Sequence, residues 1–466
     1  MTGTQLDHPR RATDRRRWAE LAVLLAAVFL VIADVFVTTV ATASIRADLS
    51  ATDTHLQLIL ALYNISYGGL LLGGGRLGDR FGRRRLFCAG VAVFLVASVW
   101  CATAATAELL VLGRLLQGIG PALLMPQVFT LIQERFSGRD RAVAFGLFST
   151  VSGVAAAGTQ VLGGVLIDAD LFGLGWRSIF WVNVVPCLVV LAAAGRLLPE
   201  RRVAGTARFD WLGLGLTVVA LVAAVTGLAF VIGAPTLAAA TTVVAVGAGG
   251  WAFHRNRSAV AGGRDPVVDP ALVAQPGLGR YLAAAAGYYA SNAVLFVLLP
   301  LWAMEVRGFP VTGAGWLFAP LAATFAVSSS LATRWFGARP RRLLRAGLVG
   351  LLVGYLGLGL ILTTAGEATA AVVVALVVIG AAMGGVAAPL NTLTTARVAP
   401  AQTGAASGLL TTALEIGYGV GAALGVGCYT LLLSGGWPGS SAYAASLAVP
   451  WLLTVALGVL VRWGDR

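Results

Sequence analysis

The sequence predicts an all-α protein that crosses a membrane many times, and two observations support this fold class. Of the 466 residues, 58% are hydrophobic and only 11% are charged, whereas soluble domains average about 25% charged. Apolar runs longer than the ~18 residues that mark a spanning helix recur along the whole chain. Helices must form these spans, because backbone groups in lipid need hydrogen-bond partners within their own segment.

The apolar runs divide into fourteen predicted spans. The first is not a cleavable signal, because a polar, arginine-rich stretch precedes a full-length span with no small-residue cleavage site. We place the spans at 19–43, 55–74, 86–106, 108–131, 142–167, 178–198, 210–232, 236–253, 278–303, 311–333, 343–364, 369–390, 404–433 and 442–463.

The positions of the arginines explain the net charge of +13 better than nucleic-acid binding does. If the N-terminus is cytoplasmic, 29 of the 33 basic residues fall in the N-terminal tail, in the loops after even-numbered spans or at the span ends beside them. Arg46, Arg177 and Arg307 fall on the other side, and Arg114 lies within a span. A bias this large is typical of the positive-inside rule. It predicts cytoplasmic termini, a lipid bilayer as partner and no nucleic acid.

Residue types that form metal centres and catalytic sites do not occur here in the required patterns. The four cysteines lie in or beside apolar runs without disulfide or metal spacing, so we interpret them as small buried apolar residues. There is also no Walker loop and no catalytic Ser–His or Cys–His arrangement. We therefore expect neither an enzyme, nor a metal, nor a cofactor, nor ATP-driven transport.

The chain also contains a short internal repeat, which predicts its domain organisation. Phe81-Gly82-Arg83 after the second span is matched by Phe336-Gly337-Ala338-Arg339 after the tenth, each followed by arginines and a new span. Repeats related by pseudo-symmetry, with substrate held between them, are common in secondary transporters. We predict a tail at 1–18, a six-helix half at 19–198, a linker with two inserted helices at 199–277 and a second six-helix half at 278–466.

The stretch 75–86 lies between two apolar runs and carries five arginines, one aspartate and three glycines. So many charges cannot lie in hydrocarbon, so we predict a tight polar hairpin on the membrane surface. Glycine permits close backbone approach and positive φ at such a turn. A cytoplasmic loop that is basic only because of the positive-inside rule is the alternative.

This loop resembles the one between the second and third helices of the major facilitator superfamily. Three further stretches, Trp176–Pro186, Phe209–Gly213 and Gly404–Leu410, are similar to hallmarks of its fourteen-helix drug:H⁺ antiporter family. The resemblance implies a monomeric exporter of drug-like molecules in a bacterial cytoplasmic membrane, driven by the proton gradient. It also implies a latch between the two halves, with these members: Gly75, Gly78, Asp79, Arg80, Gly82, Arg83 and Arg84.

Three ionisable residues inside spans are candidates for proton coupling, because a charge within a membrane is costly unless it has a function. Asp34 in the first span resembles the acidic residue of the family's first-helix motif, and Arg114 in the fourth resembles that helix's arginine. Arginine stays protonated, so its role would be electrostatic. Glu415 in span 13 could carry a second proton or bind a cationic substrate. A purely structural hydrogen bond or ion pair is the alternative for all three.

Polar and aromatic residues at helical spacing are candidates for lining a substrate cavity, although packing explains such stripes equally well. Gln117, Pro121 and Met125 share a face with Arg114, and Tyr288 and Asn292 share one with Tyr281. The full set is Thr38, Asn64, Gln117, Met125, Gln160, Tyr281, Tyr288, Asn292, Thr411 and Tyr418.

Span 5 departs from the antiporter pattern. Gly163-Gly164 are present, but Thr159-Gln160 stand where that family has Gly-Pro, so the proline kink is missing. Export is therefore open to an alternative, a proton-coupled importer or facilitator of an organic solute. A membrane sensor or scaffold that transports nothing is a third possibility, disfavoured by the lack of a long cytoplasmic domain. The identity of the substrate cannot be read from these residues.

Overall fold

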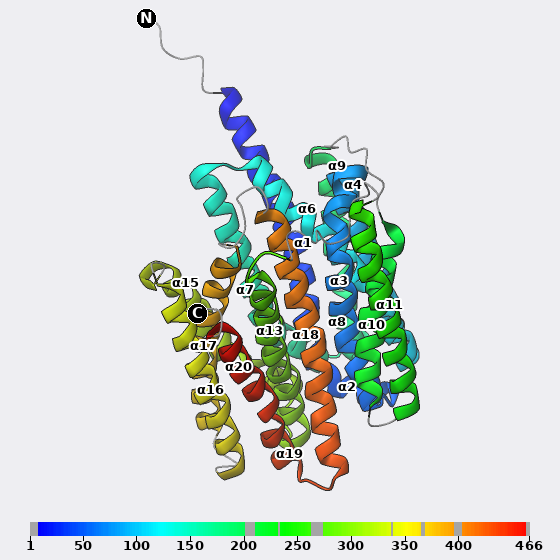
Figure 1. Ribbon diagram of the computed structural model, residues 1–466, viewed down its shortest axis with the longest axis vertical. Coiled ribbons are helices and arrows are strands. Elements are labelled where there is room, and N and C mark those ends of the chain that lie inside the picture. The colour runs from blue at the N-terminus through cyan, green and yellow to red at the C-terminus, as the bar shows by residue number, and fades with distance from the viewer. Residues whose placement is uncertain are drawn as a thin grey trace, which may run out of the picture.

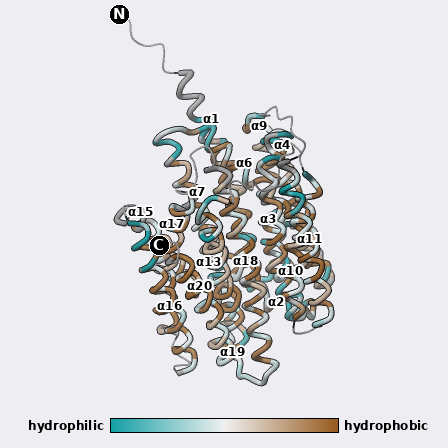
Figure 2. The backbone as a smooth tube through the Cα atoms, in the orientation of Figure 1, coloured by the Kyte–Doolittle hydropathy of each residue, from teal (hydrophilic) through white to brown (hydrophobic). Residues whose placement is uncertain are grey.

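The structure is a computed structural model, and it describes residues 8–200, 210–231, 234–261, 274–336, 339–364, 369–395 and 403–462. All regular secondary structure in these ranges is helical (Figure 1). Thirteen segments of this described part are long and apolar enough to cross a membrane. Hydrophobic residues follow the helices along most of their length (Figure 2). The chain is a multi-pass membrane protein.

The N-terminal half comprises nine helices, and the first begins well before the predicted span and projects beyond the bundle (Figure 1). Their bounds are α1 His8–Val40, α2 Thr42–Leu49, α3 Asp53–Phe81, α4 Arg83–Ala102, α5 Ala107–Gln117, α6 Ile119–Arg135, α7 Gly138–Asp168, α8 Ser178–Trp181 and α9 Val184–Leu197. Two short 3₁₀ turns, η1 Leu171–Gly173 and η2 Gly175–Arg177, connect α7 to α8.

Two helices, α10 Trp211–Phe230 and α11 Pro235–Ala261, lie within the residues predicted as a linker with inserted helices, and the division into two six-helix halves remains a prediction. The C-terminal half comprises α13 Leu278–Leu301, the π-helix η3 Trp302–Val306, α14 Val311–Trp316, α15 Phe318–Phe336, α16 Pro340–Thr364, α17 Thr369–Thr395, α18 Thr403–Ser434, α19 Gly439–Ser446 and α20 Ala448–Arg462.

The predicted second span corresponds to α3, which is 29 residues long and is not among these thirteen segments. α3 packs against α5, α6, α10 and α18, so much of its surface faces protein rather than lipid. The fourteenth crossing remains a prediction.

Four predicted spans consist of two consecutive helices, which the continuous apolar pattern did not indicate. Span 4 is divided between α5 and α6 at Gly118, and span 10 between α14 and α15 at Leu317. Spans 6 and 14 are divided in the same way, between α8 and α9 and between α19 and α20. The Gly118 break matters for the site, because it separates Arg114 and Gln117 from Pro121 and Met125.

The predicted polar hairpin at 75–86 is wrong in its extent. α3 continues to Phe81 and α4 begins at Arg83, so Gly82, with φ 101°, is the whole turn. Gly75 and Gly78 lie inside α3 instead. A Cβ at Gly78 would lie 1.9 Å from Gln127 Oε1 of α6, so this glycine allows close helix packing rather than a turn. The matching loop at Phe336–Arg339 includes residues 337–338, which are outside the described ranges.

α10 lies over the line where α3 meets α18. Val225 of α10 packs in one buried cluster with Ala61 and Ile65 of α3 and Ala423 of α18. α11 packs on the other side of α10, at the edge of the bundle (Figure 1). Apolar side chains of α11 such as Val246 are 71% exposed, as expected for a surface that faces lipid.

Two polar contacts between the halves lie at the end of the bundle opposite to the arginine-rich one. Arg46 Nη2 of α2 lies 2.5 Å from Asp53 Oδ1, and its Nε lies 3.5 Å from Glu305 Oε1 of the C-terminal half. The backbone N–H of Thr312 donates to Asp168 Oδ2 at 2.9 Å. At the arginine-rich end, Arg135 forms a bidentate pair with Glu20 within the N-terminal half.

Candidate functional site

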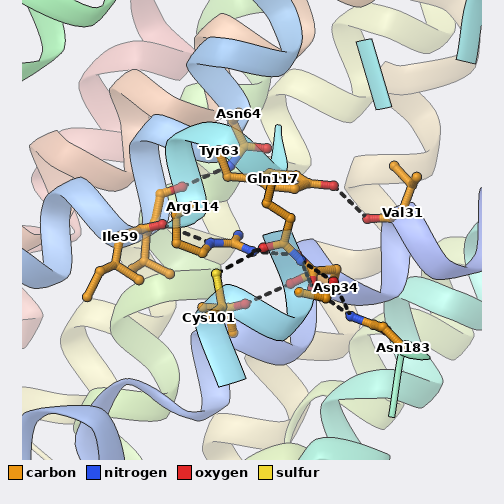
Figure 3. Close-up of polar contacts among 12 residues, drawn as sticks. Val31, Asp34, Ile59, Tyr63, Asn64, Cys101, Arg114, Gln117 and Asn183 are labelled. Carbon is orange, nitrogen blue, oxygen red and sulfur yellow. Dashed lines mark hydrogen bonds and ion pairs between the residues drawn. The ribbon is translucent and has the colours of Figure 1, made fainter. Parts of the chain in front are cut away.

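Asp34 is the centre of a buried polar cluster within the N-terminal half (Figure 3). Its side chain is fully buried, and three donors surround its two oxygens. Arg114 Nη1 pairs with Oδ2, Gln117 Nε2 donates to Oδ1 at 2.9 Å, and Asn183 Nδ2 donates to Oδ1 at 3.0 Å. The donors come from α5 and from the α8–α9 break, so three parts of the half meet at one carboxylate.

Arg114 is held from several directions. Its Nε donates to the Ile59 carbonyl of α3 at 3.2 Å, and its Nη1 donates to Gln117 Oε1 at 2.7 Å. Its guanidinium carbon lies 4.3 Å from the centre of the Tyr63 ring, which is within cation–π range. Hydrogen bonds and the Tyr63 ring thus hold the Arg114 guanidinium in one position.

The end of α5 at Gly118 brings this arginine against α3. A Cβ at Gly118 would lie 2.1 Å from Ser66 Oγ and 2.2 Å from the Tyr63 carbonyl, so no larger residue fits without a shift of backbone. The glycine therefore sets the approach that places Arg114 under Tyr63. Asp34 and Arg114 were both predicted as candidates for proton coupling, and the structure brings them together.

Two members of the cluster were not predicted. Asn183 lies in the Trp176–Pro186 stretch, which served only to indicate the family, and Ser98 of α4 was not singled out. Ser98 Oγ accepts from Gln117 Nε2 at 2.9 Å. Gln117 was predicted to line a cavity, but it is fully buried within this cluster. The only feature of the sequence that could have indicated Asn183 and Ser98 is that they are neutral polar residues inside apolar runs.

Glu415 lies apart from the Asp34 cluster, on α18 where this helix packs against α3. A Cβ at Gly68 would lie 3.0 Å from Glu415 Cβ, so the two backbones meet at this level. Its side chain is half-buried, and in the described part of the chain no hydrogen bond or ion pair reaches its carboxylate. Tyr67 and Tyr289 lie within electrostatic range of it.

The other predicted cavity residues of the N-terminal half are buried and contact neighbours within that half. Thr38 Oγ1 donates to the Asp34 carbonyl at 2.8 Å, and Asn64 Nδ2 donates to the Leu60 carbonyl at 2.9 Å. Gln160 is buried and shares a hydrogen bond with Thr39 at 3.3 Å. Met125 packs in the apolar core of this half. Their assignment to a substrate cavity remains a prediction.

The cavity residues predicted on α13 lie inside the C-terminal half. Tyr281 and Tyr288 belong to its large apolar core, and the Tyr288 hydroxyl donates to the Met383 carbonyl at 2.9 Å. Asn292 Oδ1 accepts from Tyr355 at 3.3 Å. On α18, Thr411 is half-buried and Tyr418 is buried. The α13 residues thus stabilise the packing of one half.

Two of the predicted latch residues, Arg83 and Arg84, form ion pairs within the N-terminal half. Arg83 pairs with Glu134 of α6, and Arg84 Nε lies 3.4 Å from Glu200 Oε2. The Arg80 guanidinium lies over the exposed Phe81 ring, 5.6 Å from its centre. The side chain of Asp79 lies outside the part that the structure describes, and a latch between the halves remains a prediction.

The Gly163-Gly164 pair of span 5 packs closely without a proline. A Cβ at Gly164 would lie 2.5 Å from Thr312 Cα of α14, and one at Gly315 would lie 2.5 Å from the Gln160 carbonyl. Helix α7 therefore touches the C-terminal half along its last turns through small residues, as membrane helices commonly do. Gln160 takes part through its backbone, at the position where the antiporter pattern has proline.

A further ion pair outside the membrane-spanning segments joins α2 to the α7–α8 connection. Arg177 Nη1 lies 2.5 Å from Asp48 Oδ2, and the Trp176 indole N–H donates to the same oxygen at 3.0 Å. These two donors, with the guanidinium first, lower the pKa of Asp48 below its usual value.

Comparisons with known proteins agree with this architecture. The family model of the Major Facilitator Superfamily matches residues 24–422. The chain is 33% identical to a probable actinorhodin transporter of Streptomyces coelicolor, over 88% of this chain and 72% of that protein. It is 33% identical to the puromycin resistance protein pur8 of Streptomyces alboniger, over 88% of this chain and 81% of that protein. It is 32% identical to the cephamycin export protein CmcT of Amycolatopsis lactamdurans, over 93% of this chain and 89% of that protein.

Among solved structures, a bacterial homologue of the human lysosomal transporter Spinster, in an inward-facing and unoccupied conformation, superposes with a TM-score of 0.69 at 20% identity, covering 96% of each chain. An auto-inhibited peptide transporter of the POT family superposes with a TM-score of 0.64 at 15% identity, covering 95% of this chain and 97% of that one. These likenesses support the fold. With a family model matching most of its length, the chain belongs to the Major Facilitator Superfamily.

Proposed function

We propose that this protein is a proton-coupled exporter of antibiotic-like, hydrophobic or amphipathic small molecules that works by alternating access. The proposal of proton coupling rests on the Asp34 cluster, in which a fully buried carboxylate has three hydrogen-bond donors, one of them the Arg114 guanidinium. The names of the three relatives, each a transporter, resistance or export protein for an antibiotic, support export over import. The proton gradient supplies the energy, and no cofactor takes part.

The cluster favours two alternative states of Asp34. With Arg114, Gln117 and Asn183 in place, the donors stabilise the charged carboxylate. When helix motion withdraws them, the same buried group is left without partners, and binding a proton relieves the cost of its charge. A proton can drive the cycle because its affinity for Asp34 then differs between the two states.

Transport in proteoliposomes tests this proposal. Ethidium is a suitable probe, because its permanent charge prevents passive trapping by a pH gradient. Wild-type protein should accumulate ethidium toward the acidic side, whereas Asp34→Asn should not accumulate it but should still exchange it across the membrane without a gradient. Accumulation that persists in Asp34→Asn with the same dependence on ΔpH would place the coupling elsewhere, with Glu415 as the next residue to test.

A further inference from the structure

The connection between α7 and α8 presents two large apolar side chains that the protein itself hardly covers. Phe172 is 97% exposed and its neighbour Leu171 is 52% exposed. Phe172 is the most exposed large hydrophobic residue in the described part of the chain. Apolar surface is stabilised when it leaves water, so a ring this exposed gains free energy from any apolar surroundings outside the protein. Exposed apolar groups of this kind commonly mark contact with a membrane or with another protein.

The backbone holds this apolar pair outward at a conformational cost. Phe172 has φ 61°, and Asp170 just before the pair has φ 41°, so both lie in the left-handed region. Residues other than glycine seldom adopt this region, and a bulky side chain there is strained. Strained residues persist where surrounding contacts determine the backbone, and they are common at functional sites.

Hydrogen bonds determine the shape of this turn. Asp170 Oδ1 accepts from the Gly175 N–H at 2.7 Å, and the Asp170 carbonyl accepts from the Gly173 N–H at 3.0 Å. At its end the turn is joined to α2 by the ion pair between Arg177 and Asp48. The two apolar side chains are therefore presented by an ordered turn whose backbone has its own partners.

The end of α7 that leads into the turn exposes apolar side chains on one side only. Gly163 and Gly164 lie against Val37 of α1 and Thr312 of α14. Leu162 and Val165, on the other side of the helix, are exposed. Because α7 belongs to a candidate membrane span, these exposed apolar side chains face lipid.

The segment that leaves the turn has the same character. Trp181, Val182 and Val185 are all exposed, and they lie in the next candidate span, where α8 gives way to α9. Tryptophan is enriched where a span meets the membrane surface. The apolar pair thus lies between two lipid-facing stretches of chain.

Charged residues place the turn at the membrane surface rather than within hydrocarbon. Asp168 ends α7, and Asp48 and Arg177 form their ion pair beside the turn. Charges are costly in hydrocarbon but are tolerated at the level of the lipid headgroups. An apolar side chain attached at this level can enter the boundary between headgroups and acyl chains, as the apolar faces of membrane-surface helices do.

We infer that Leu171 and Phe172 are a membrane anchor that inserts into the lipid leaflet at the end of the bundle opposite to the arginine-rich one. The partner is phospholipid, because lipid already borders the chain on both sides of the turn. This inference goes beyond the proposed function and does not depend on it. The anchor holds the last residue of α7, Asp168, at a fixed depth where it contacts Thr312 of the C-terminal half.

Spin labelling of the full-length protein in nanodiscs of phosphatidylethanolamine and phosphatidylglycerol tests the location of the pair. A nitroxide is attached to Phe172→Cys after the partly buried Cys88 and Cys428 are replaced by alanine. Collisions of the label with oxygen, which concentrates in lipid, are compared with collisions with a nickel chelate that stays in water. We expect oxygen to collide with this label more often than the chelate does.

Ala105→Cys is the matched control. Ala105 is exposed in the neighbouring loop between α4 and α5, where Arg177 Nη2 donates to the Ala104 carbonyl at 3.1 Å. This loop carries Thr103 and Thr106 instead of large apolar residues, so the nickel chelate should dominate there. Equal ratios of oxygen to nickel collisions at the two labelled positions would overturn the proposal.

A second pair of variants tests whether the Phe172 ring does the anchoring. A label at Leu171→Cys should lose collisions with oxygen when Phe172→Asn is added, because asparagine tolerates the left-handed region but brings no apolar ring. Thermal unfolding of Phe172→Asn should occur no earlier than that of wild type, which separates loss of lipid contact from loss of the fold. If the Leu171→Cys label keeps its oxygen collisions, the ring is not the anchor.

Photo-crosslinking in intact cells identifies what covers the pair. p-Benzoylphenylalanine in place of Phe172 keeps an aromatic side chain, and mass spectrometry of the product distinguishes a phospholipid adduct from a protein adduct. We expect the phospholipid adduct to predominate. A predominant adduct with another protein, or with a second copy of this chain, would show that the pair is a protein interface and would overturn the proposal.

Discussion

Asp34 and Glu415 are both carboxylates within predicted membrane spans, but their surroundings differ in every respect that sets their chemistry. Asp34 is fully buried and receives hydrogen bonds from three side chains, one of them a guanidinium. Glu415 is half-buried, and no partner reaches it in the described ranges. A carboxylate in a span can thus be surrounded by partners or lack them. Removing the partner of Asp34 should therefore cost far more stability than neutralising Glu415.

The largest effect is expected from removing the partner of Asp34. Arg114→Met leaves a buried carboxylate without its cation and should lower the free energy of unfolding by about 3–5 kcal/mol. Unfolding by sodium dodecyl sulfate in mixed micelles measures this loss. The double variant with Asp34→Asn should recover a large part of it, because neither charge then remains. A double variant as unstable as Arg114→Met would show that packing around Arg114, not its charge, is responsible.

The next effect concerns the glycine that lets Arg114 approach α3. Gly118→Ala introduces a Cβ about two ångströms from atoms of Ser66 and Tyr63, so we expect a loss of about 1–3 kcal/mol in unfolding free energy. Gly153→Ala in α7 is the control, because nothing lies within 4 Å of its added Cβ. That substitution should be neutral or stabilising by up to about 1 kcal/mol. Equal behaviour of both variants would contradict the close approach at Gly118.

Asp48 provides an intermediate case, a carboxylate that is paired but exposed. Its side chain is 47% exposed, so its pair with Arg177 should contribute no more than about 1 kcal/mol, which Asp48→Asn would remove. Because its folded-state pKa is lowered, the contribution is complete above the unfolded value near 3.9 and is lost as the pH falls through the folded value. Thermal unfolding of wild type and Asp48→Asn at pH 7 and near pH 3 measures this contribution. A stability difference between the two proteins that grows as the pH falls would contradict the prediction.

The smallest effect on stability is expected at Glu415. Because no partner is left behind, Glu415→Gln should change the unfolding free energy by about 0.5 kcal/mol or less, in either direction. The same detergent titration as for Arg114→Met serves for the comparison. A loss of several kcal/mol would mean that Glu415 is compensated like Asp34, and the contrast between the two carboxylates would disappear.

Functional candidates could be predicted from the sequence where a charged residue interrupts an apolar run. Asp34 and Arg114 stand out because charges are rare inside apolar runs. Asn183 and Ser98 did not stand out, because neutral polar residues occur in spans at little cost. The helix break at Gly118 was not predicted either, because the sequence is equally apolar on both sides of it.

The polar hairpin was mispredicted for a physical reason as well. Arginines near a helix end can extend their long side chains toward the membrane surface, so polar residues do not have to end the helix. α3 therefore continues through Arg76 and Arg80 to Phe81, and one glycine makes the turn. Which residues occupy the interior of each half, such as Tyr281 and Tyr288, depends on how helices pack. Helical spacing alone cannot distinguish a packed aromatic side chain from one that lines a cavity.

The position of α10 has a consequence for how the two halves can move. This helix touches α3 of one half and α18 of the other through apolar side chains, with Leu221 and Val218 against Gly69 and Val225 beside Ala423. Van der Waals contacts of this kind have no fixed direction and are individually weak. Helices can slide past one another at such a surface without first breaking hydrogen bonds. In the proposed transport cycle, α10 would continue to cover the line where α3 meets α18 while the two halves change their angle.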